Sequence, residues 1–406
     1  KSELRAGDVR MQHPLSFMYG RYSMKILFIN LPYYGHVVPT IGLVQELIKQ
    51  GCEVTYLCPL DWKELIAESG AEFREYKNHR QLSEQMKNAY ATAESIIEGY
   101  DFVIYEQFFF LGKHLAEKYN KPVARIFTAP VTNEKLMKEF ITSKGPLSIF
   151  KYKWITKAFT KDIVGNIPMK TDNWLDEIIY NPPALNLVYT LREYQPYEEE
   201  FPDEQYKFLG PSIYERNDEV FNFVKGKNPV VYISLGTVIK GATSFFQSCI
   251  EAFRGENIDV IISVGKKFNA RKLKSVPHNI HIYNFVPQLK VLKMTDVFVT
   301  HGGMNSVSEA LSLGTPMVVI PFVSDQPVNA RCVEKIGVGK QLEYSAVNKD
   351  NLKKCVLSVL SNNGMKDNIE EVRKLINQAP GNQGGAKMIL DYYKQVNFEK
   401  NHYLCN

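Results

Sequence analysis

Short apolar runs alternate with amphipathic stretches along most of the chain from Met24 onward. The runs 25–30 (KILFIN), 53–58 (EVTYLC) and 101–106 (DFVIYE) have the length of buried strands, and a helical pattern follows each of them. This alternation predicts parallel βαβ units with helices on both faces of a sheet. A second series begins at Pro229 (PVVYISLGT). The pattern therefore predicts an α/β chain with two Rossmann-like domains, whose ligands bind beyond the carboxyl ends of the strands.

Breaks in this rhythm divide the chain into segments. Residues 133–181 are rich in aromatic and basic side chains and show no clear strand, so we expect helical excursions from the first domain. The stretch 192–218 is acidic and contains prolines, which favours a connection between domains. The expected segments are an extension that is a cloning remnant or disordered (1–23), a first domain (24–212), a linker (213–228), a second domain (229–385) and a helical tail that returns to the first domain (386–406).

Composition narrows the class of protein. The 406 residues are 45% hydrophobic and 23% charged, as in ordinary globular proteins. The net charge of +5 is small for this length, and no arginine-rich stripe interleaves with aromatics, so we expect no nucleic-acid partner. No apolar run approaches the ~18 residues that span a bilayer. The six cysteines lack C-x-x-C spacing and are typical of reduced thiols. A cytoplasmic protein without an integral membrane segment is expected.

The densest group of candidate binding residues lies in the stretch 285–326. After an apolar strand, the His-Gly-Gly turn 301–303 enters a helix near Asn305. Free backbone N–H groups and the helix dipole would make an anion site there. Glu309, one turn further on, could accept hydrogen bonds from sugar hydroxyls, and the loop 234–237 offers small residues after another strand. Each element alone is explained as well by a tight strand–helix turn, but their coincidence at successive strand ends favours a phosphate site.

The stretch 285–326 resembles the donor-binding signature of the UDP-dependent glycosyltransferases of the GT-B fold. This group includes plant secondary-metabolite glucosyltransferases and bacterial macrolide glycosyltransferases, and the resemblance is closest to the macrolide type. It covers nearly all of the range 24–393. It implies two Rossmann-like domains with parallel sheets facing a central cleft. It also implies a UDP-sugar co-substrate, with UDP-glucose expected, and no other cofactor.

The resemblance carries donor roles onto matching positions. Phe285 stands where plant members stack a tryptophan on uracil, and a phenyl ring can still stack with less area. The backbone of Val286 and Gln288 would bind the uracil edge, and Glu309 the ribose. The diphosphate would be held by residues at both strand ends, and the transferred sugar by the Asp-Gln pair, which resembles that of glucose-using members. The residues expected to bind the diphosphate or the sugar are Ser234, Gly236, Thr237, His301, Gly303, Asn305, Ser306, Asp325 and Gln326.

The first domain contains a candidate base. An acceptor hydroxyl needs a base near neutral pH, for which histidine is the usual residue. His36 follows a predicted strand and matches a Gly-His motif of the family, whereas a lone loop histidine is more often structural. The family orients this histidine with an aspartate at the end of a later strand. Here that position is Glu106, one methylene longer, which predicts a different geometry for the pair or a bridging water; Asp101 lies at the opposite end of the strand.

Aromatic residues near this pair suit an apolar acceptor such as a phenol, a flavonoid or a macrolide, although each ring is equally explained as core. The candidates are Tyr33, Tyr34, Phe108, Phe109 and Phe140. No Asp-x-Asp motif or zinc-type His/Cys spacing is present, so we expect no metal.

The sequence predicts an inverting, metal-independent hexosyltransferase. One alternative is a GT-B transferase that acts on a lipid-linked acceptor at a membrane surface, which the basic segment 151–161 would suit. Another is a non-catalytic nucleotide-sugar-binding protein, which is suggested by the glutamate at position 106 in place of the family's aspartate. A two-carboxylate glycosidase would leave the diphosphate site unexplained. No oligomeric state is predicted.

Overall fold

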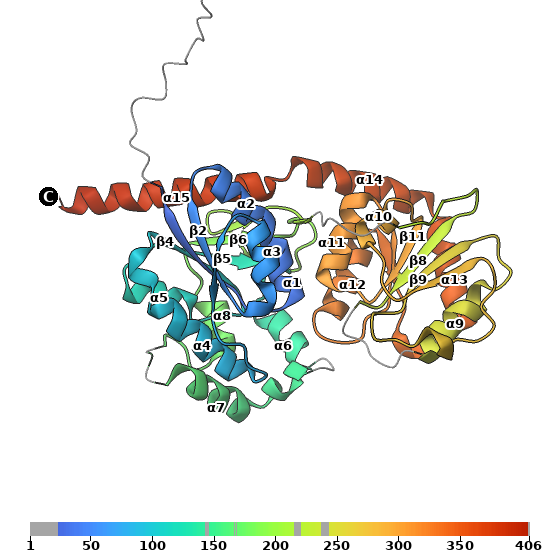
Figure 1. Cartoon of the computed structure of the whole chain (residues 1–406), viewed down its shortest axis with the longest axis horizontal. Coiled ribbons are helices and arrows are strands. Elements are labelled where there is room, and N and C mark those ends of the chain that lie inside the picture. Colours follow the sequence, from blue (N-terminus) through green and yellow to red (C-terminus); the bar gives the residue numbers. More distant parts are fainter. Residues whose placement is uncertain are drawn as a thin grey trace, which may run out of the picture.

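The computed structural model describes residues 23–142, 146–165, 167, 169–214, 221–236 and 243–404. Within these ranges the strands form two separate parallel sheets, each flanked by helices, and the two domains lie side by side (Figure 1). The first sheet ends at residue 208 and the second begins at residue 230. Thr237, predicted to hold the diphosphate, lies outside the described residues.

The first sheet has seven strands in the order β3-β2-β1-β4-β5-β6-β7, all parallel. Its strands are β1 (Lys25–Ile29), β2 (Glu53–Cys58), β3 (Glu72–Glu75), β4 (Phe102–Glu106), β5 (Val123–Phe127), β6 (Leu185–Val188) and β7 (Tyr206–Phe208). The helices of this domain are α1 (Tyr34–Val37), α2 (Ile41–Lys49), α3 (Lys63–Glu68), α4 (Leu82–Glu94), α5 (Gly112–Lys118), α6 (Glu134–Thr142), α7 (Lys153–Val164) and α8 (Trp174–Tyr180).

Side chains on the strands of this sheet alternate between two apolar cores, as the period of a strand requires. Leu27 and Ile29 of β1 pack into the core that contains residues of α4, α5, α7 and α8. Ile26 and Phe28 of the same strand pack into the core that contains residues of α2 and α3. The sheet is therefore buried on both faces, which explains why its strands read as continuous apolar runs in the sequence.

The second sheet has six parallel strands in the order β10-β9-β8-β11-β12-β13. Its strands are β8 (Val230–Ser234), β9 (Asp259–Ser263), β10 (Ile280–Tyr283), β11 (Val297–Thr300), β12 (Met317–Val319) and β13 (Gly339–Gln341). The helices are α9 (Thr243–Phe253), α10 (Gln288–Leu292), α11 (Met304–Leu313), α12 (Gln326–Lys335), α13 (Lys349–Leu360) and α14 (Asn363–Gln378).

Both sheets reverse their strand order at one point. In the first sheet the reversal places β1 beside β4, and in the second it places β8 beside β11. Loops that leave two such neighbouring strands diverge to opposite faces, which opens a crevice at the carboxyl ends. Of the candidate residues, His36 follows β1 and Glu106 ends β4. In the second sheet, Ser234 ends β8 and His301 follows β11. The topology thus places all four at reversal points.

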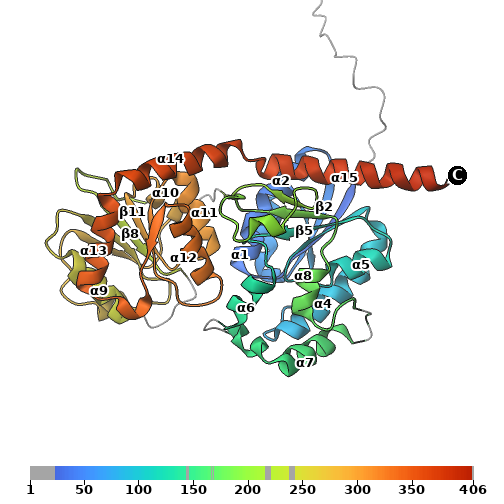
Figure 2. The ribbon, with the colours of Figure 1, turned by 180° about the vertical axis from the view of Figure 1, so that it is seen from behind.

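The C-terminal helix α15 (Gly381–Leu404) leaves the second domain and runs along the first, where it packs against α2 (Figures 1 and 2). A Cβ on Gly385 would lie 2.8 Å from Leu209 Cδ1, so a larger residue would displace the Leu209 side chain where this helix approaches the first domain. The rings of Tyr392 and Tyr393 lie edge-on to Phe102, with centroids 6.2 and 6.3 Å away. The helix ties the end of the second domain to the first.

In the ranges that the structure describes, no helix combines the length and apolar character that crossing a membrane requires. The cytoplasmic location stays a prediction.

Candidate active site

His36 and Glu106 meet at the reversal point of the first sheet. His36 Nδ1 and Glu106 Oε1 form a close ion-pair contact of 2.9 Å, and neither atom makes a hydrogen bond of standard geometry to any described residue. Glu106 Oε2 accepts a hydrogen bond of 3.0 Å from the Phe108 N–H. The Glu106 side chain is completely buried, whereas that of His36 is 20% exposed. Because Nδ1 faces the carboxylate, Nε2 is the nitrogen left for an incoming group.

Opposing effects set the protonation of His36. Burial lowers its pKa, but the adjacent Glu106 carboxylate raises it, and Asp325 raises it further, so that the pKa lies above its ordinary value of 6.5. Asp325 belongs to the second domain. Its electrostatic influence on His36 means that the carboxyl edges of the two domains face one another, and α1 and α12 lie on the facing sides (Figure 1).

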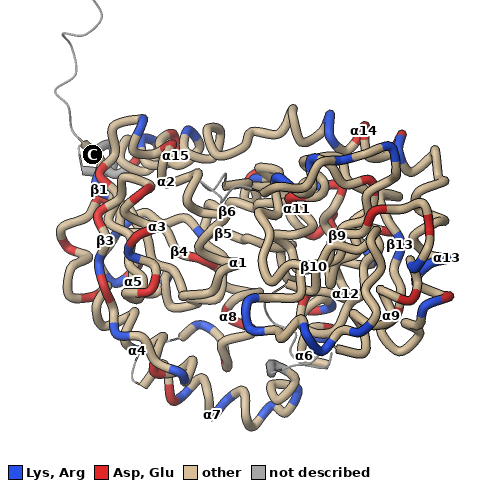
Figure 3. Tube along the Cα trace, turned by 45° about the vertical axis from the view of Figure 1, so that its right-hand side comes forward, with Lys and Arg blue, Asp and Glu red and all other residues tan. Residues whose placement is uncertain are grey.

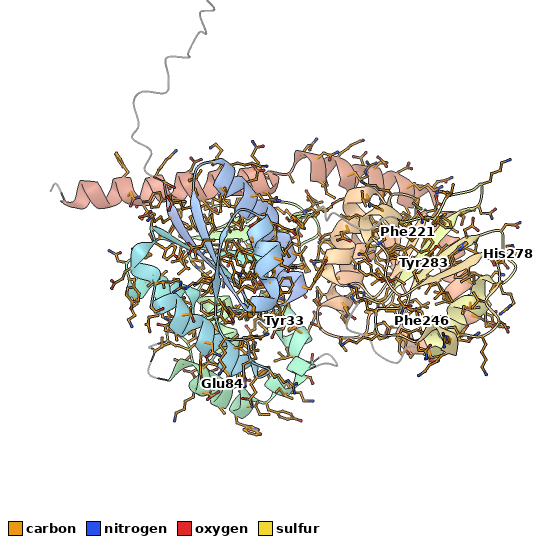
Figure 4. The ribbon with its side chains drawn as sticks, viewed as in Figure 1. Tyr33, Glu84, Phe221, Phe246, His278 and Tyr283 are labelled. Carbon is orange, nitrogen blue, oxygen red and sulfur yellow. The ribbon has the colours of Figure 1, made fainter. Side chains whose placement is uncertain are left out.

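Two rings flank the His36 imidazole. The centroid of Tyr33 lies 5.5 Å from that of His36 and the centroid of Phe108 lies 5.2 Å away, both edge-on. Tyr33 is 43% exposed and lies on the side of the first domain that faces the second (Figure 4). Tyr34 is 44% exposed and contacts Trp62. These residues are accessible to an acceptor.

The remaining acceptor candidates lie deeper. Phe140 is partly buried against the first-domain core. Phe109 has no exposed surface and is part of that core, so its placement is at odds with the predicted acceptor contact. The physical reason is local: the chain turns directly after β4, which directs Phe108 toward His36 and Phe109 into the interior.

Glycines surround His301 at the reversal point of the second sheet. A Cβ on Gly236 would lie 2.6 Å from His301 Cε1, and a Cβ on Gly303 would lie 2.6 Å from His301 Nε2. Gly303 is the N-cap of α11, and no side chain of the described residues caps this helix start. The ring therefore lies beside the N–H groups of the helix start. Residues larger than glycine at positions 236 and 303 would fill the space around it, and an anion site needs that space. Asn305 and Ser306 lie in the first turn of α11.

His301 is uncharged in this environment. It is 7% exposed, and burial lowers its pKa to about 4. Its Nδ1 atom is buried and has no hydrogen-bond partner among the described residues. A buried polar atom without a partner costs free energy, which an added ligand or water would recover. At neutral pH this imidazole can donate one hydrogen bond to a phosphate oxygen.

Behind the helix start, Gln288 connects three groups. Its Nε2 donates to Glu309 Oε2 at 2.7 Å and to Ser306 Oγ at 3.2 Å, and its Oε1 accepts from the Tyr232 hydroxyl at 3.2 Å. The Gln288 side chain thus fixes the Glu309 carboxylate. The predicted backbone contact of Gln288 with uracil remains compatible with this arrangement, because only the side chain is used.

Phe285 is 43% exposed in the loop between β10 and α10, while the adjacent Val286 is buried. Lys266 Nζ lies 4.8 Å from the centroid of the Phe285 ring. A cation at this distance interacts favourably with an aromatic face. Sequence reasoning missed Lys266, because the Lys266 loop follows β9, a different strand from the one that precedes Phe285.

The proposed sugar residues have different surroundings. Gln326 Oε1 accepts hydrogen bonds from the backbone N–H groups of Phe322 and Val323, at 2.8 and 3.0 Å, so part of its amide shapes its own loop. Burial raises the pKa of Asp325, while a hydrogen bond from Asn329 lowers it. In the other reversal-point loop, the Ser234 hydroxyl accepts from the Gly236 N–H at 3.3 Å.

Comparison with known proteins identifies the family. A model of the UDP-glucoronosyl and UDP-glucosyl transferases matches residues 214–382. The uncharacterised UDP-glucosyltransferase YojK of Bacillus subtilis is 33% identical over 402 residues, which cover 91% of this chain and 98% of the relative. The chain belongs to the UDP-glycosyltransferase family.

Further relatives agree with this assignment. The oleandomycin glycosyltransferase of Streptomyces antibioticus is 23% identical and covers 90% of each chain. The solved structure of the glycotransferase of kitacinnamycin has a TM-score of 0.80 and 25% identity, and covers 91% of this chain and 99% of its own. The UDP-glycosyltransferase described above thus has the GT-B fold, with His36 and His301 at the facing edges of its two domains.

Proposed function

We propose that this UDP-glycosyltransferase transfers a hexose, glucose in the first instance, from a UDP-sugar to a hydroxyl of an apolar small molecule, with inversion. The observation that carries the proposal is the 2.9 Å contact between His36 Nδ1 and the buried Glu106 carboxylate, because Nε2 is then the ring nitrogen that can take a proton from an acceptor. The names of the relatives, a UDP-glucosyltransferase and an oleandomycin glycosyltransferase, support the choice of sugar and of acceptor class.

In the proposed reaction His36 Nε2 takes the proton of the acceptor hydroxyl. The oxygen attacks the anomeric carbon as the bond from that carbon to the diphosphate oxygen breaks, and UDP leaves with the bonding electron pair. Attack from the face opposite an α-linked UDP gives a β-glycoside. Glu106 holds Nδ1 protonated and stabilises the imidazolium that forms, which is the role of the carboxylate behind a catalytic histidine.

In this proposal, groups of the second domain and not a metal stabilise the negative charge on the departing UDP. Among the described residues, no side chain caps the start of α11, whose N–H groups are presented to the ligand, and none is a hydrogen-bond partner of His301 Nδ1. Preorganised donors in a water-poor site stabilise developing charge strongly. Phe285 would stack on the base, Glu309 would accept from the ribose, and Asp325 would accept from the sugar.

The proposal is tested by mass spectrometry of products formed from UDP-glucose with a panel of phenols, flavonoids and macrolides. The wild type is expected to give an acceptor heavier by one anhydrohexose, together with UDP, in the presence of excess EDTA. Nuclear magnetic resonance of the product should show the β configuration. If the wild type binds UDP but makes no product with any member of the panel, the small-molecule assignment fails, and a non-catalytic nucleotide-sugar binder becomes the better account.

A second candidate function, transfer to an acceptor held at a membrane surface, is favoured by the start of α7. Trp154 is 72% exposed and Tyr152 is 51% exposed, and lysines follow along the same helix (Figure 3). Exposed aromatics among basic residues suit an anionic interface. Sedimentation with phosphatidylserine vesicles, compared with phosphatidylcholine vesicles and with Trp154→Ala, decides between the two: binding that needs both the anionic lipid and Trp154 supports this candidate.

A further inference from the structure

Asn329, in the second turn of α12, joins two parts of the donor side. Its side chain has no exposed surface. Its Nδ2 atom donates to Asp325 Oδ2 at 2.9 Å and to the Gly302 carbonyl oxygen at 2.9 Å. An amide nitrogen carries two protons, so both donors are used. The two acceptors belong to the two loops that leave neighbouring strands β11 and β12.

A tyrosine from the first domain also contacts Asn329, and the two acceptors fix the orientation of its amide. The Tyr194 hydroxyl donates to the backbone carbonyl oxygen of Asn329 at 3.2 Å and lies 3.4 Å from the side-chain Oδ1. Reversing the amide would place Oδ1 against the Asp325 carboxylate and the Gly302 carbonyl, so that acceptors would face acceptors. Tyr194 is 1% exposed and lies in the apolar core of the second domain, although it follows β6 of the first.

The Gly302 carbonyl, which accepts from Asn329, belongs to a turn that only glycine can form. The Gly302 φ of +83° is in the left-handed region, and a Cβ there would lie 2.6 Å from Val319 Cγ1. The residue therefore stays a glycine, and glycine leaves its peptide groups free to rotate. A hydrogen bond to its carbonyl restricts the turn that presents His301 and the start of α11.

We propose that Asn329 is a positioning residue for sugar transfer. Its amide holds the Asp325 carboxylate, the sugar contact, in fixed relation to the Gly302 turn, the diphosphate contact. The inference rests on the proposed function, in which Asp325 binds the transferred sugar. Because Tyr194 donates to Asn329, the donor geometry is also linked to the domain that contains His36.

Loss of Asn329 should weaken the binding of UDP-glucose more than the binding of UDP. Loss of Asn329 removes a hydrogen bond to a charged carboxylate, which is worth a factor on the order of 10 to 100, and a neutral one to Gly302, which is worth less. UDP lacks the transferred sugar and therefore makes no contact with Asp325. Isothermal titration calorimetry of the full chain with UDP-glucose and with UDP, without acceptor, should therefore show that Asn329→Ala lowers the ratio of the two affinities by about 10-fold or more.

Asn279→Ala is the matched control. Asn279 is also buried and donates to backbone carbonyls, of Phe253 and Ile258, but it lies outside the candidate site. This variant should lower the melting temperature and leave the affinity ratio unchanged. Tyr194→Phe, which keeps the packing and removes only the hydroxyl, should lower the ratio by a smaller factor of about 2 to 10, and it serves if Asn329→Ala does not fold.

Asp325→Asn separates the two hypotheses. If it lowers the affinity ratio while Asn329→Ala and Tyr194→Phe leave it at the wild-type value, the positioning role is wrong and the sugar contact stands. If Asp325→Asn also leaves the ratio unchanged, the sugar contact itself is wrong. A fall in Asn329→Ala that disappears in the Asp325→Ala background supports the proposal, because two residues that act through one contact are not additive.

Discussion

The Glu106→Gln substitution tests how the carboxylate acts on His36. Glu106 Oε2 accepts from the Phe108 N–H, so the glutamine oxygen will take this place and its NH₂ group will face His36 Nδ1. Nδ1 then has to accept a hydrogen bond, and the imidazole proton moves to Nε2. The nitrogen that should take the acceptor proton is already protonated. A comparable change in the tautomer of the catalytic histidine lowers the kcat of a serine protease by about 10⁴-fold.

The charge of Glu106 contributes as well. Two unit charges 2.9 Å apart interact by about 6 kcal/mol at an effective dielectric constant of about 20. Much of this offsets the cost of burying the carboxylate, so the working figure is that of a charge-assisted hydrogen bond, about 1.5–3 kcal/mol. That stabilisation of the imidazolium corresponds to about 10- to 150-fold in rate, and the reversed tautomer increases the loss.

The assay is kcat/KM against pH, with product measured by chromatography. In the wild type activity falls as pH drops through the pKa of His36, which lies above 6.5. In Glu106→Gln the contributions of the Glu106 carboxylate that raise this pKa are gone, while burial still lowers the pKa and Asp325 still raises it, so the remaining activity should fall at a lower pH.

The matched control is Glu177→Gln. Glu177 Oε1 lies 2.7 Å from His114 Nε2 in a second buried pair, which connects α8 to α5. This variant should change stability and leave the pH profile of kcat/KM as in the wild type. If Glu106→Gln keeps both the rate and the position of the acidic limb, then Glu106 does not act on the base, and the mechanism is refuted.

Three further predictions concern the donor side. Phe285→Ala should weaken UDP binding by about 1–3 kcal/mol, the range measured for a base stacked on an aromatic ring, in a calorimetric titration; unchanged affinity would mean that uracil binds elsewhere. Gly303→Ala places a Cβ 2.6 Å from His301 Nε2, so the ring must shift and UDP affinity should fall; equal affinity would remove His301 from the diphosphate site. Burial lowers the pKa of His301 to about 4 from 6.5 in the unfolded chain, so in urea titrations the wild type should lose about 3 kcal/mol more stability than His301→Gln as pH falls from 6.5 to 4; equal losses would contradict a buried neutral His301.

Much of the architecture could be predicted because parallel strands buried on both faces leave continuous apolar runs. The runs beginning at Lys25 and Pro229 correspond to β1 and β8, and the turn at His301 leads from β11 into α11. The motif residues could be placed for the same reason, since residues at the carboxyl ends of such strands share one edge of the sheet. The pairing of His36 with Glu106 follows from the adjacency of β1 and β4.

What the sequence did not reveal depends on contacts between distant segments. Asn329 and Tyr194 are 135 residues apart and come from different domains, so no local pattern connects them. The Lys266 loop and Phe285 are brought together only by the pairing of β9 with β10. Phe109 was misplaced because an aromatic run after a strand does not show which ring points inward.

The most direct test of the central claim is the single-turnover rate of glucosyl transfer from UDP-glucose to an accepted phenol by the wild type, His36→Ala and His114→Ala. His114 is paired with a buried glutamate as His36 is, but it lies away from the facing edges of the domains. The account predicts that the wild type and His114→Ala form product at similar rates, and that His36→Ala binds UDP-glucose normally and is slower by a factor of about 100 or more. A His36→Ala enzyme that transfers glucose at the wild-type rate would contradict the account.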